Sequence, residues 1–147
     1  QLVAQCDLAV ASDTAQFGTS GINIGLFCST PMVAVTRNVS RKHAMELLLT
    51  GDLISASDAE KFGLINKVAL PDELDQTVDK LATKIANKSP LAVSLGKELF
   101  YKQIEEGISE AYQHATDVIT CNMMSEDATS GVDAFLSKKP LPQWKGK

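Results

Sequence analysis

The first twelve residues, QLVAQCDLAVAS, constrain the fold most, because core-type residues begin at once and no initiator methionine precedes them. Gln1 to Cys6 can continue a helix, and Leu8 to Ala11 read as a short buried strand. Such a helix and strand need other elements against which to bury their apolar faces. We therefore expect the 147 residues to be part of a longer protein, in which a preceding segment supplies those partners.

A change of hydrophobic periodicity near residue 70 divides the chain into two predicted regions. Upstream of this point, residues 41–50 form a predicted helix that Ser40 caps and Gly51 ends, and a shorter helix opens at Ser55. Residues 64–69 (LINKVA) alternate between apolar and polar side chains, which predicts a strand. The upstream region is therefore predicted to mix helices and strands.

Downstream of Pro71 the pattern is helical throughout. Apolar residues recur at three- and four-residue spacing and form an amphipathic stripe that consists of Leu74, Val78, Leu81, Ala82 and Ile85. Ser89-Pro90 ends this helix, and the apolar spacing beyond it predicts further helices. The chain is thus predicted to be α/β, with a mixed part over residues 1–70 and an all-helical part over residues 71–147.

Residues 16–36 form a predicted loop rich in Gly, Ser and Thr, the type of segment that commonly lines a functional site. Turns are expected at Gly18, Gly21 and Gly25. Their spacing matches neither the dinucleotide-binding fingerprint nor a P-loop, so we interpret them as ordinary turns rather than as a phosphate cradle.

The charge and cysteine content argue against several classes of protein. Fourteen Lys and Arg stand against eighteen Asp and Glu, for a net charge of −4, whereas nucleic-acid-binding proteins are typically basic. The three cysteines lie far apart without a C-x-x-C pair, which argues against a zinc site and favours a reducing compartment. No apolar run reaches the roughly 18 residues that span a bilayer. We expect no metal, no nucleic-acid partner and no membrane span.

Few side chains are arranged for catalysis. Cys28 and His43 are the one pair that suggests a nucleophile and its base, but His43 follows two basic residues on a predicted helix and is interpreted as a surface histidine. Cys6 and Cys121 lie in apolar runs and are expected in the core. Four lysines fall in the last ten residues, and this basic tail is either a frayed end or a contact for an anionic ligand. The residues alone assign no reaction.

Residues 50–74, TGDLISASDAEKFGLINKVALPDEL, resemble the crotonase (enoyl-CoA hydratase/isomerase) superfamily. The motif elements are a helix ending in T-G, then I-S-A-x-x-A, then G-L-[IV]-x-x-V, then a helix that opens with acidic residues. The resemblance continues in residues 1–18 and 130–144, so it spans essentially the whole chain, and NIGLFCSTP (residues 23–31) indicates one subgroup. It implies a C-terminal part of a crotonase (ββα)n spiral, followed by a helical trimerisation region.

The same resemblance implies that a preceding segment supplies the two backbone N–H groups of an oxyanion hole, which stabilise an enolate-like transition state. Hydratases of this family use two glutamates that flank a water. In this chain the first falls on Gln1 and the second on Gly21. An amide cannot take a proton from water, and glycine has no side chain. A carboxylate that some isomerases use falls on Cys28 or Ser29, and Phe27 and Cys28 are candidate substrate contacts.

Phe135 and Lys138 match positions that meet the adenine and the phosphate of coenzyme A, although Phe135 could equally anchor the last helix in a core. The resemblance implies an acyl-CoA-binding protein of lipid metabolism that is a poor hydratase, with coenzyme A as part of the substrate and no separate cofactor. The alternatives are hydrolysis, decarboxylation or isomerisation of a thioester by residues of the preceding segment, or a non-catalytic scaffold or modulator. A trimer or hexamer is implied, in the cytoplasm if bacterial and in the mitochondrial matrix if eukaryotic.

Overall fold

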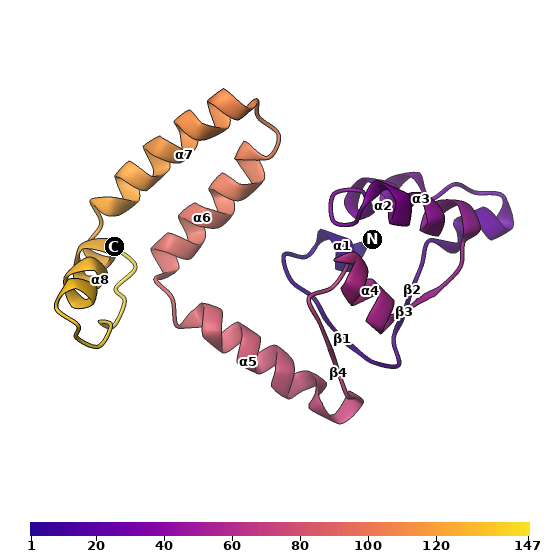
Figure 1. Cartoon of the computed structure of the whole chain (residues 1–147), viewed down its shortest axis with the longest axis horizontal. Coiled ribbons are helices and arrows are strands. Elements are labelled where there is room, and N and C mark those ends of the chain that lie inside the picture. The colour runs from indigo at the N-terminus through magenta and orange to yellow at the C-terminus, as the bar shows by residue number, and fades with distance from the viewer. The chain divides into compact units, whose positions relative to one another are not determined.

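The computed structural model describes all 147 residues and contains two compact units, Gln1–Lys80 and Leu81–Lys147. The first unit contains every strand, and the second is entirely helical (Figure 1). The boundary between the units lies within helix α5 (Leu74–Ala86), whereas the change of periodicity near residue 70 coincides with the end of the last strand. Each unit is described here by itself.

The first unit contains two short strand pairs and six helical segments that precede α5. In chain order these are α1 (Leu2–Gln5), β1 (Val10–Ser12), β2 (Gln16–Phe17), the 3-10 helix η1 (Ser20–Ile24), α2 (Ser29–Val35), α3 (Arg41–Thr50), β3 (Ile54–Ser55), α4 (Ala56–Phe62) and β4 (Lys67–Ala69), with a 3-10 turn η2 (Pro71–Glu73) leading into α5.

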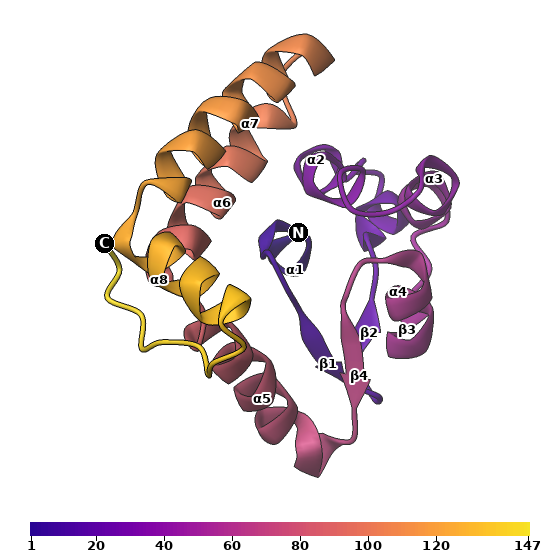
Figure 2. The same ribbon diagram turned by 60° about the vertical axis from the view of Figure 1, so that its left-hand side comes forward.

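Strands β1 and β4 run parallel, side by side in both views, with Val10 opposite Lys67 and Ser12 opposite Ala69 (Figures 1 and 2). The Asn66 side chain extends this pair, because its amide oxygen accepts the Ala9 N–H at 2.8 Å. Strands β2 and β3 pair antiparallel. A parallel pair requires a crossover connection, and the chain between β1 and β4 supplies it with helices, as expected for a unit built from strands and helices in alternation.

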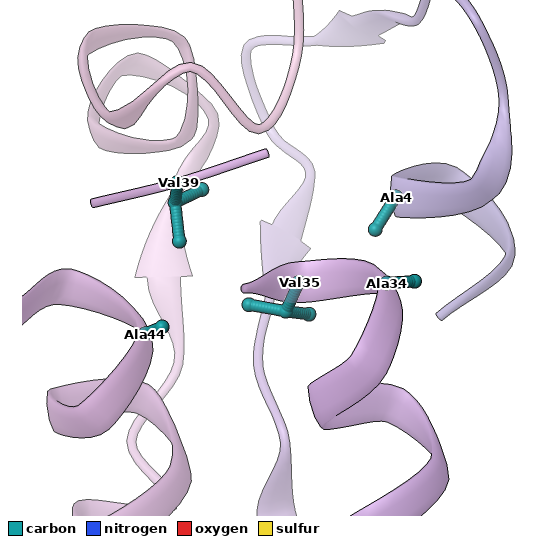
Figure 3. Packing of buried hydrophobic residues seen from close by; sticks show 5 residues of the cluster. All are labelled: Ala4, Ala34, Val35, Val39 and Ala44. Carbon is teal, nitrogen blue, oxygen red and sulfur yellow. The ribbon is translucent and has the colours of Figure 1, made fainter. Parts of the chain in front are cut away.

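Small side chains dominate the core of the first unit. One cluster consists of Ala4, Ala34, Val35, Val39 and Ala44, contributed by α1, by α2 with the residues after it, and by α3 (Figure 3). A second cluster consists of Ala11, Ala56, Ala59 and Ile65. Alanine lets backbones approach closely, and the largest side chain that is fully buried is Leu48. Burial of one leucine stabilises a fold by about 1.5–3 kcal/mol.

The two predicted helix caps of this unit are confirmed. The Ser40 hydroxyl accepts the His43 N–H at the start of α3, and the Ser55 hydroxyl accepts the Asp58 N–H at the start of α4. Gly51 ends α3 and adopts a φ of 69°, a left-handed conformation that favours glycine. Local sequence is sufficient for these boundaries because each cap is made by residues within four positions of one another.

Two sequence predictions about this part of the chain are wrong. Residues 16–36, expected to be a loop, contain β2, η1 and the helix α2, whose first turn accommodates Pro31 because a proline there removes no helical hydrogen bond. Cys6 is exposed rather than in the core, because α1 ends at Gln5 and Cys6 turns away in extended backbone. Cys121 is also exposed, on a face of α7 in the second unit.

The second unit consists of the end of α5 followed by α6 (Pro90–Gln103), α7 (Ile108–Met123) and α8 (Glu126–Leu136). A four-residue connection joins α6 to α7, and the two helices lie side by side as a hairpin in both views (Figures 1 and 2). Neither helix buries a residue, and large apolar side chains such as Phe100, Ile108 and Tyr112 are more than half exposed. None of the chain's helices combines the length and the apolar character needed to cross a bilayer.

Candidate functional site

A cavity of about 190 Å³ lies in the first unit, and Gln1 is one of its lining residues. Its walls come from α1, from β2 and the segment after it, from α2, from α3 and from the segment after α4, and its polar lining residues are Gln1, Gln16 and Thr19. The Thr19 hydroxyl donates to the Leu47 carbonyl at 2.8 Å, so its proton is already engaged. No lining residue carries a carboxylate, and this cavity therefore holds amide and hydroxyl groups that can orient a water but cannot remove its proton.

Gln1 begins α1 and is exposed. Its carbonyl accepts the Gln5 N–H at 3.0 Å, and its side chain makes no capping hydrogen bond. The residue at this position is therefore held by the helix backbone and not by its own side chain. A carboxylate could replace the amide here without breaking a capping hydrogen bond.

Gly21 is in a very different environment. Its N–H donates to the Cys28 thiol, with 3.3 Å between N and Sγ, and its carbonyl accepts the Leu26 N–H at 3.0 Å. A Cβ atom added at Gly21 would lie 2.8 Å from the Cys28 sulfur and 2.9 Å from the Leu26 carbonyl oxygen. Real Cβ atoms do not make contacts this short. The backbone conformation itself is not the obstacle, because Gly21 is not among the glycines with positive φ.

Two further hydrogen bonds fix the turn around Gly21 to helix α3. Thr19 donates to the carbonyl of Leu47, and Asn23 donates to the carbonyl of Gly51 at 3.3 Å. The turn is therefore tied down on both sides of Gly21. A substitution at this position has to displace either a backbone carbonyl or a turn that is bonded to a neighbouring helix.

Cys28 and Phe27 follow this turn. Cys28 is half-buried at the start of α2, and its thiol is the group that approaches Gly21. Phe27 is 42% exposed, and the neighbouring Ile24 and Leu26 are exposed still further. The sequence-predicted residues Gly21 and Cys28 thus lie in direct contact, whereas neither Phe27 nor Cys28 lines the cavity that contains Gln1.

His43 is not the surface histidine expected from its basic neighbours. Its ring stacks on Phe62 of α4 with 3.7 Å between the ring centroids, and its Nδ1 is buried without a hydrogen-bond partner. Helical spacing places this residue on the side of α3 that faces α4, which local charge could not reveal. The Cys28 thiol contacts Gly21 and the His43 ring contacts Phe62, so the structure gives no support to a Cys–His nucleophile pair.

Phe135 and Lys138 lie in the second unit, at the end of α8. Phe135 is 78% exposed, so the alternative that it anchors α8 in a core is wrong for this chain. The Lys138 N–H donates to the Phe135 carbonyl at 3.1 Å, and Lys138 has a φ of 52°, the one positive value among the residues other than glycine. Both candidate residues for a nucleotide contact are therefore presented at one exposed turn.

The tail beyond Lys138 is not a frayed end. The backbone N–H groups of Lys145 and Gly146 donate to the Asp127 carboxylate at 2.7 and 3.0 Å. The Ser89 hydroxyl donates to the same carboxylate at 2.6 Å, and this bond, with that from Lys145, lowers the pKa of Asp127 although burial opposes the shift. Sequence analysis missed this buried carboxylate, because its partners lie 18 to 38 positions away.

The sequence of this chain matches the family model Enoyl-CoA hydratase/isomerase over residues 1–147, and the chain belongs to that family, the crotonases. It is 47% identical over 144 residues to rat (Rattus norvegicus) "Enoyl-CoA hydratase domain-containing protein 3, mitochondrial", a match that covers 98% of this chain and 48% of that protein. The human protein of the same name is 47% identical, with 47% of its length covered. The subgroup indicated by residues 23–31 is this one.

Solved structures agree with this assignment. An enoyl-CoA hydratase from Mycobacterium smegmatis superposes with a TM-score of 0.94 at 51% identity, covering 97% of this chain and 55% of that one. Human enoyl-CoA hydratase domain-containing protein 3 superposes with a TM-score of 0.90 at 46% identity, covering 96% of this chain and 56% of that one. The chain has the crotonase fold, and it spans about half the length of the relatives it matches.

Proposed function

We propose that this chain is part of an acyl-CoA-binding crotonase that hydrates enoyl-CoA poorly. The observation that carries the proposal is the closed position at Gly21, where the Leu26 carbonyl and the Cys28 thiol occupy the space that a side chain would need. Gln1, at the other position where hydratases of the family use a glutamate, supplies only an amide. Neither position can exchange a proton with water.

The expected chemical consequence is a loss of acid–base catalysis without a loss of thioester binding. A positioned general acid or base contributes roughly 10²- to 10⁴-fold to a rate. An oxyanion hole acts independently of these groups, and we propose that the segment preceding this chain supplies it. The polarised thioester would then be bound and activated, but the water beside it would not be deprotonated.

The exposed turn at Phe135 and Lys138 is proposed to contact the nucleotide end of coenzyme A, the aromatic ring at the adenine and the ammonium at a phosphate. Coenzyme A would be part of the substrate, and no separate cofactor is proposed. The unburied helices α6 and α7, with an open apolar groove of about 560 Å³ between them, support self-association as a trimer or hexamer.

The cellular compartment that we propose depends on the organism from which the protein comes. The animal relatives named above carry the word mitochondrial in their names, so we propose the mitochondrial matrix if the source is eukaryotic and the cytoplasm if it is bacterial. In either case the substrate class, a fatty acyl thioester, connects the protein with lipid metabolism.

The test uses the full-length protein that contains this chain. Calorimetric titration with an unreactive acyl-CoA should show binding, and steady-state assays with crotonyl-CoA should show hydration that is slow compared with that of a family member that has both glutamates. Brisk hydration would overturn the proposal, since proton transfer would then come from other residues. Absence of binding at millimolar acyl-CoA would favour the scaffold alternative instead.

A further inference from the structure

The C-terminal strap, which we define as residues 138–147, runs back along helix α8 and returns to its first turn (Figures 1 and 2). At its start, the Lys139 N–H donates to the Ala134 carbonyl at 2.9 Å. At its end, the Lys147 carbonyl accepts the Asp127 N–H at 3.0 Å. The strap is therefore attached to both ends of the same helix and forms a closed loop with it.

The middle of the strap is held by Trp144. Its indole Nε1 donates to the Asn87 carbonyl at 2.9 Å. Its ring covers Gly131 so closely that a Cβ added there would lie 3.2 Å from a ring carbon. Glycine at position 131 thus lets the tryptophan lie against α8. The indole connects the strap to that helix and to Asn87, the residue that follows α5.

Asp127 is the polar centre of this arrangement and is only 3% exposed. Its two carboxylate oxygens accept three hydrogen bonds, from the Ser89 hydroxyl and from the N–H groups of Lys145 and Gly146. Ser89 also caps α6, because its oxygen accepts the Ala92 N–H at 3.2 Å. One carboxylate therefore joins the start of α6, the start of α8 and the end of the strap.

The opposite end of the closed loop carries the exposed turn at Phe135 and Lys138. Packing does not hold these two side chains, since Phe135 is 78% exposed and Lys138 is exposed as well. What fixes their direction is the backbone, in which Lys138 adopts a left-handed conformation that residues with a side chain rarely adopt. Two local hydrogen bonds close the end of α8 around this conformation, from the Lys138 N–H to the Phe135 carbonyl and from the Lys139 N–H to the Ala134 carbonyl, and the chain continues from here into the strap.

We infer that Asp127 is a positioning residue for the nucleotide contact, because it anchors the far end of the strap that begins at the left-handed turn of Lys138. This inference rests on the proposed function, in which that turn meets coenzyme A. Asp127 itself is buried and touches no ligand. Its effect on binding should therefore depend on Lys138 and disappear when Lys138 is absent.

The test compares full-length protein carrying Asp127→Asn with the matched control Asp133→Asn, which makes the same charge change at an exposed position of α8. Asparagine keeps the size of the side chain but leaves the Gly146 N–H facing an amide in place of a carboxylate oxygen. Hydrogen exchange of the Lys145 and Gly146 amides reports the strap directly. Affinities for coenzyme A and 3′-dephospho-coenzyme A report the contact with the phosphate.

With Asp127→Asn, we expect the two amides to exchange faster and the preference for coenzyme A over its dephospho form to fall about fivefold, the size expected for one charge-assisted contact. Lys138→Ala should produce the same loss of preference, and the double variant no more than either single one. Asp133→Asn should change neither readout. If Asp127 has only a structural role, Asp127→Asn should weaken the binding of both ligands equally, and its effect should add to that of Lys138→Ala.

The inference is overturned if the strap amides exchange faster while the preference for coenzyme A stays unchanged, or if Asp127→Asn leaves those amides protected. Failure of the unmodified protein to bind coenzyme A would contradict the proposed function, while the exchange data would still report on the strap. Should Asp127→Asn not fold, Trp144→Phe carries the same expectation, since it removes the hydrogen bond to Asn87 and the part of the indole ring that lies against Gly131. An unaltered preference in that variant, with the strap released, likewise overturns the inference.

Discussion

The turn around Gly21 and the turn at the end of α8 differ in what fixes them. The first is closed by the Leu26 carbonyl and the Cys28 thiol, so that a side chain cannot enter. The second is open to solvent and is closed by two local hydrogen bonds, and the strap that follows it is anchored by the buried Asp127 carboxylate. The positions that depart from the family's catalytic pattern thus lie in the unit that contains both buried apolar clusters, and the proposed nucleotide contact lies in the unit where packing is sparse.

This difference indicates that the packing around Gly21 excludes a glutamate from that position, while the proposed nucleotide contact would depend on a few polar bonds. A substitution in the first unit should therefore change mainly the free energy of unfolding. A substitution in the second unit should change mainly the affinity for coenzyme A. The experiments below test this contrast.

The largest effect is expected from Leu48→Ala in α3. Leu48 is 1% exposed, and removing its side chain should lower the free energy of unfolding by about 2–5 kcal/mol through lost burial and the cavity that remains. Leu49→Ala is the matched control, because Leu49 is 57% exposed and the same change there should cost less than about 1 kcal/mol. Chemical denaturation of the full-length protein measures both. Equal losses would mean that the first unit does not have the core described.

Gly21→Ala should destabilise the protein by about 1–3 kcal/mol, because the new Cβ forces apart the Leu26 carbonyl and the Cys28 thiol. Gly96→Ala in α6 is the control: nothing lies within 4 Å of a Cβ there, and alanine in a helix is favoured over glycine by about 0.5–1 kcal/mol. The two changes should therefore have opposite signs in thermal or chemical unfolding. If Gly21→Ala left the free energy of unfolding unchanged, the turn would be shown to accommodate a Cβ atom without cost.

The closed position at Gly21 also limits attempts to restore the hydration of crotonyl-CoA by mutation. Gln1→Glu should be tolerated, since the Gln1 side chain makes no capping bond. Gly21→Glu should lower the melting temperature and leave crotonyl-CoA hydration slow, alone or combined with Gln1→Glu, because the second carboxylate has no place beside the first. Adding Cys28→Gly removes only one of the two obstructing groups. A large rate increase in the double glutamate variant, with melting unchanged, would contradict a closed position.

Sequence alone was a good guide where structure is local. The α3 and α4 boundaries follow from caps and glycines within one helical turn. It was a poor guide where contacts are distant: His43 stacks on Phe62, and the glycine at 21 reflects an approach by Leu26 and Cys28 that no spacing rule reveals. The family resemblance placed the candidate positions, but only the structure distinguishes a closed position from an open one.

A smaller effect is expected at the end of α8. Lys138→Ala should weaken coenzyme A binding by about 1 kcal/mol, the value typical of a single exposed charge-assisted contact. The loss should shrink at high salt, because exposed charges are screened. Lys139→Ala removes the same charge from the neighbouring residue and should have little effect. If calorimetry finds both variants equally weakened, the tail attracts the ligand only through its overall charge.

The smallest effect concerns acid release of the strap. Hydrogen bonds from Ser89 and Lys145 lower the pKa of Asp127 below the ordinary value of 3.8, so the folded state favours the ionised carboxylate. Stabilisation by this group is therefore fully present above that ordinary value and is lost only as the pH falls through the still lower pKa of the folded state. The remaining charged pair at the strap, Lys145 with Glu126, is exposed on both sides and contributes little. Protection of the Gly146 amide, corrected for its intrinsic exchange rate, should thus be constant from neutral pH to about pH 4 and fall below it, and Asp127→Asn should abolish this dependence. Loss of protection in high salt at neutral pH would mean that the exposed pair and not the buried carboxylate holds the strap, and loss between pH 5 and 7 would mean that a group other than the Asp127 carboxylate controls its release.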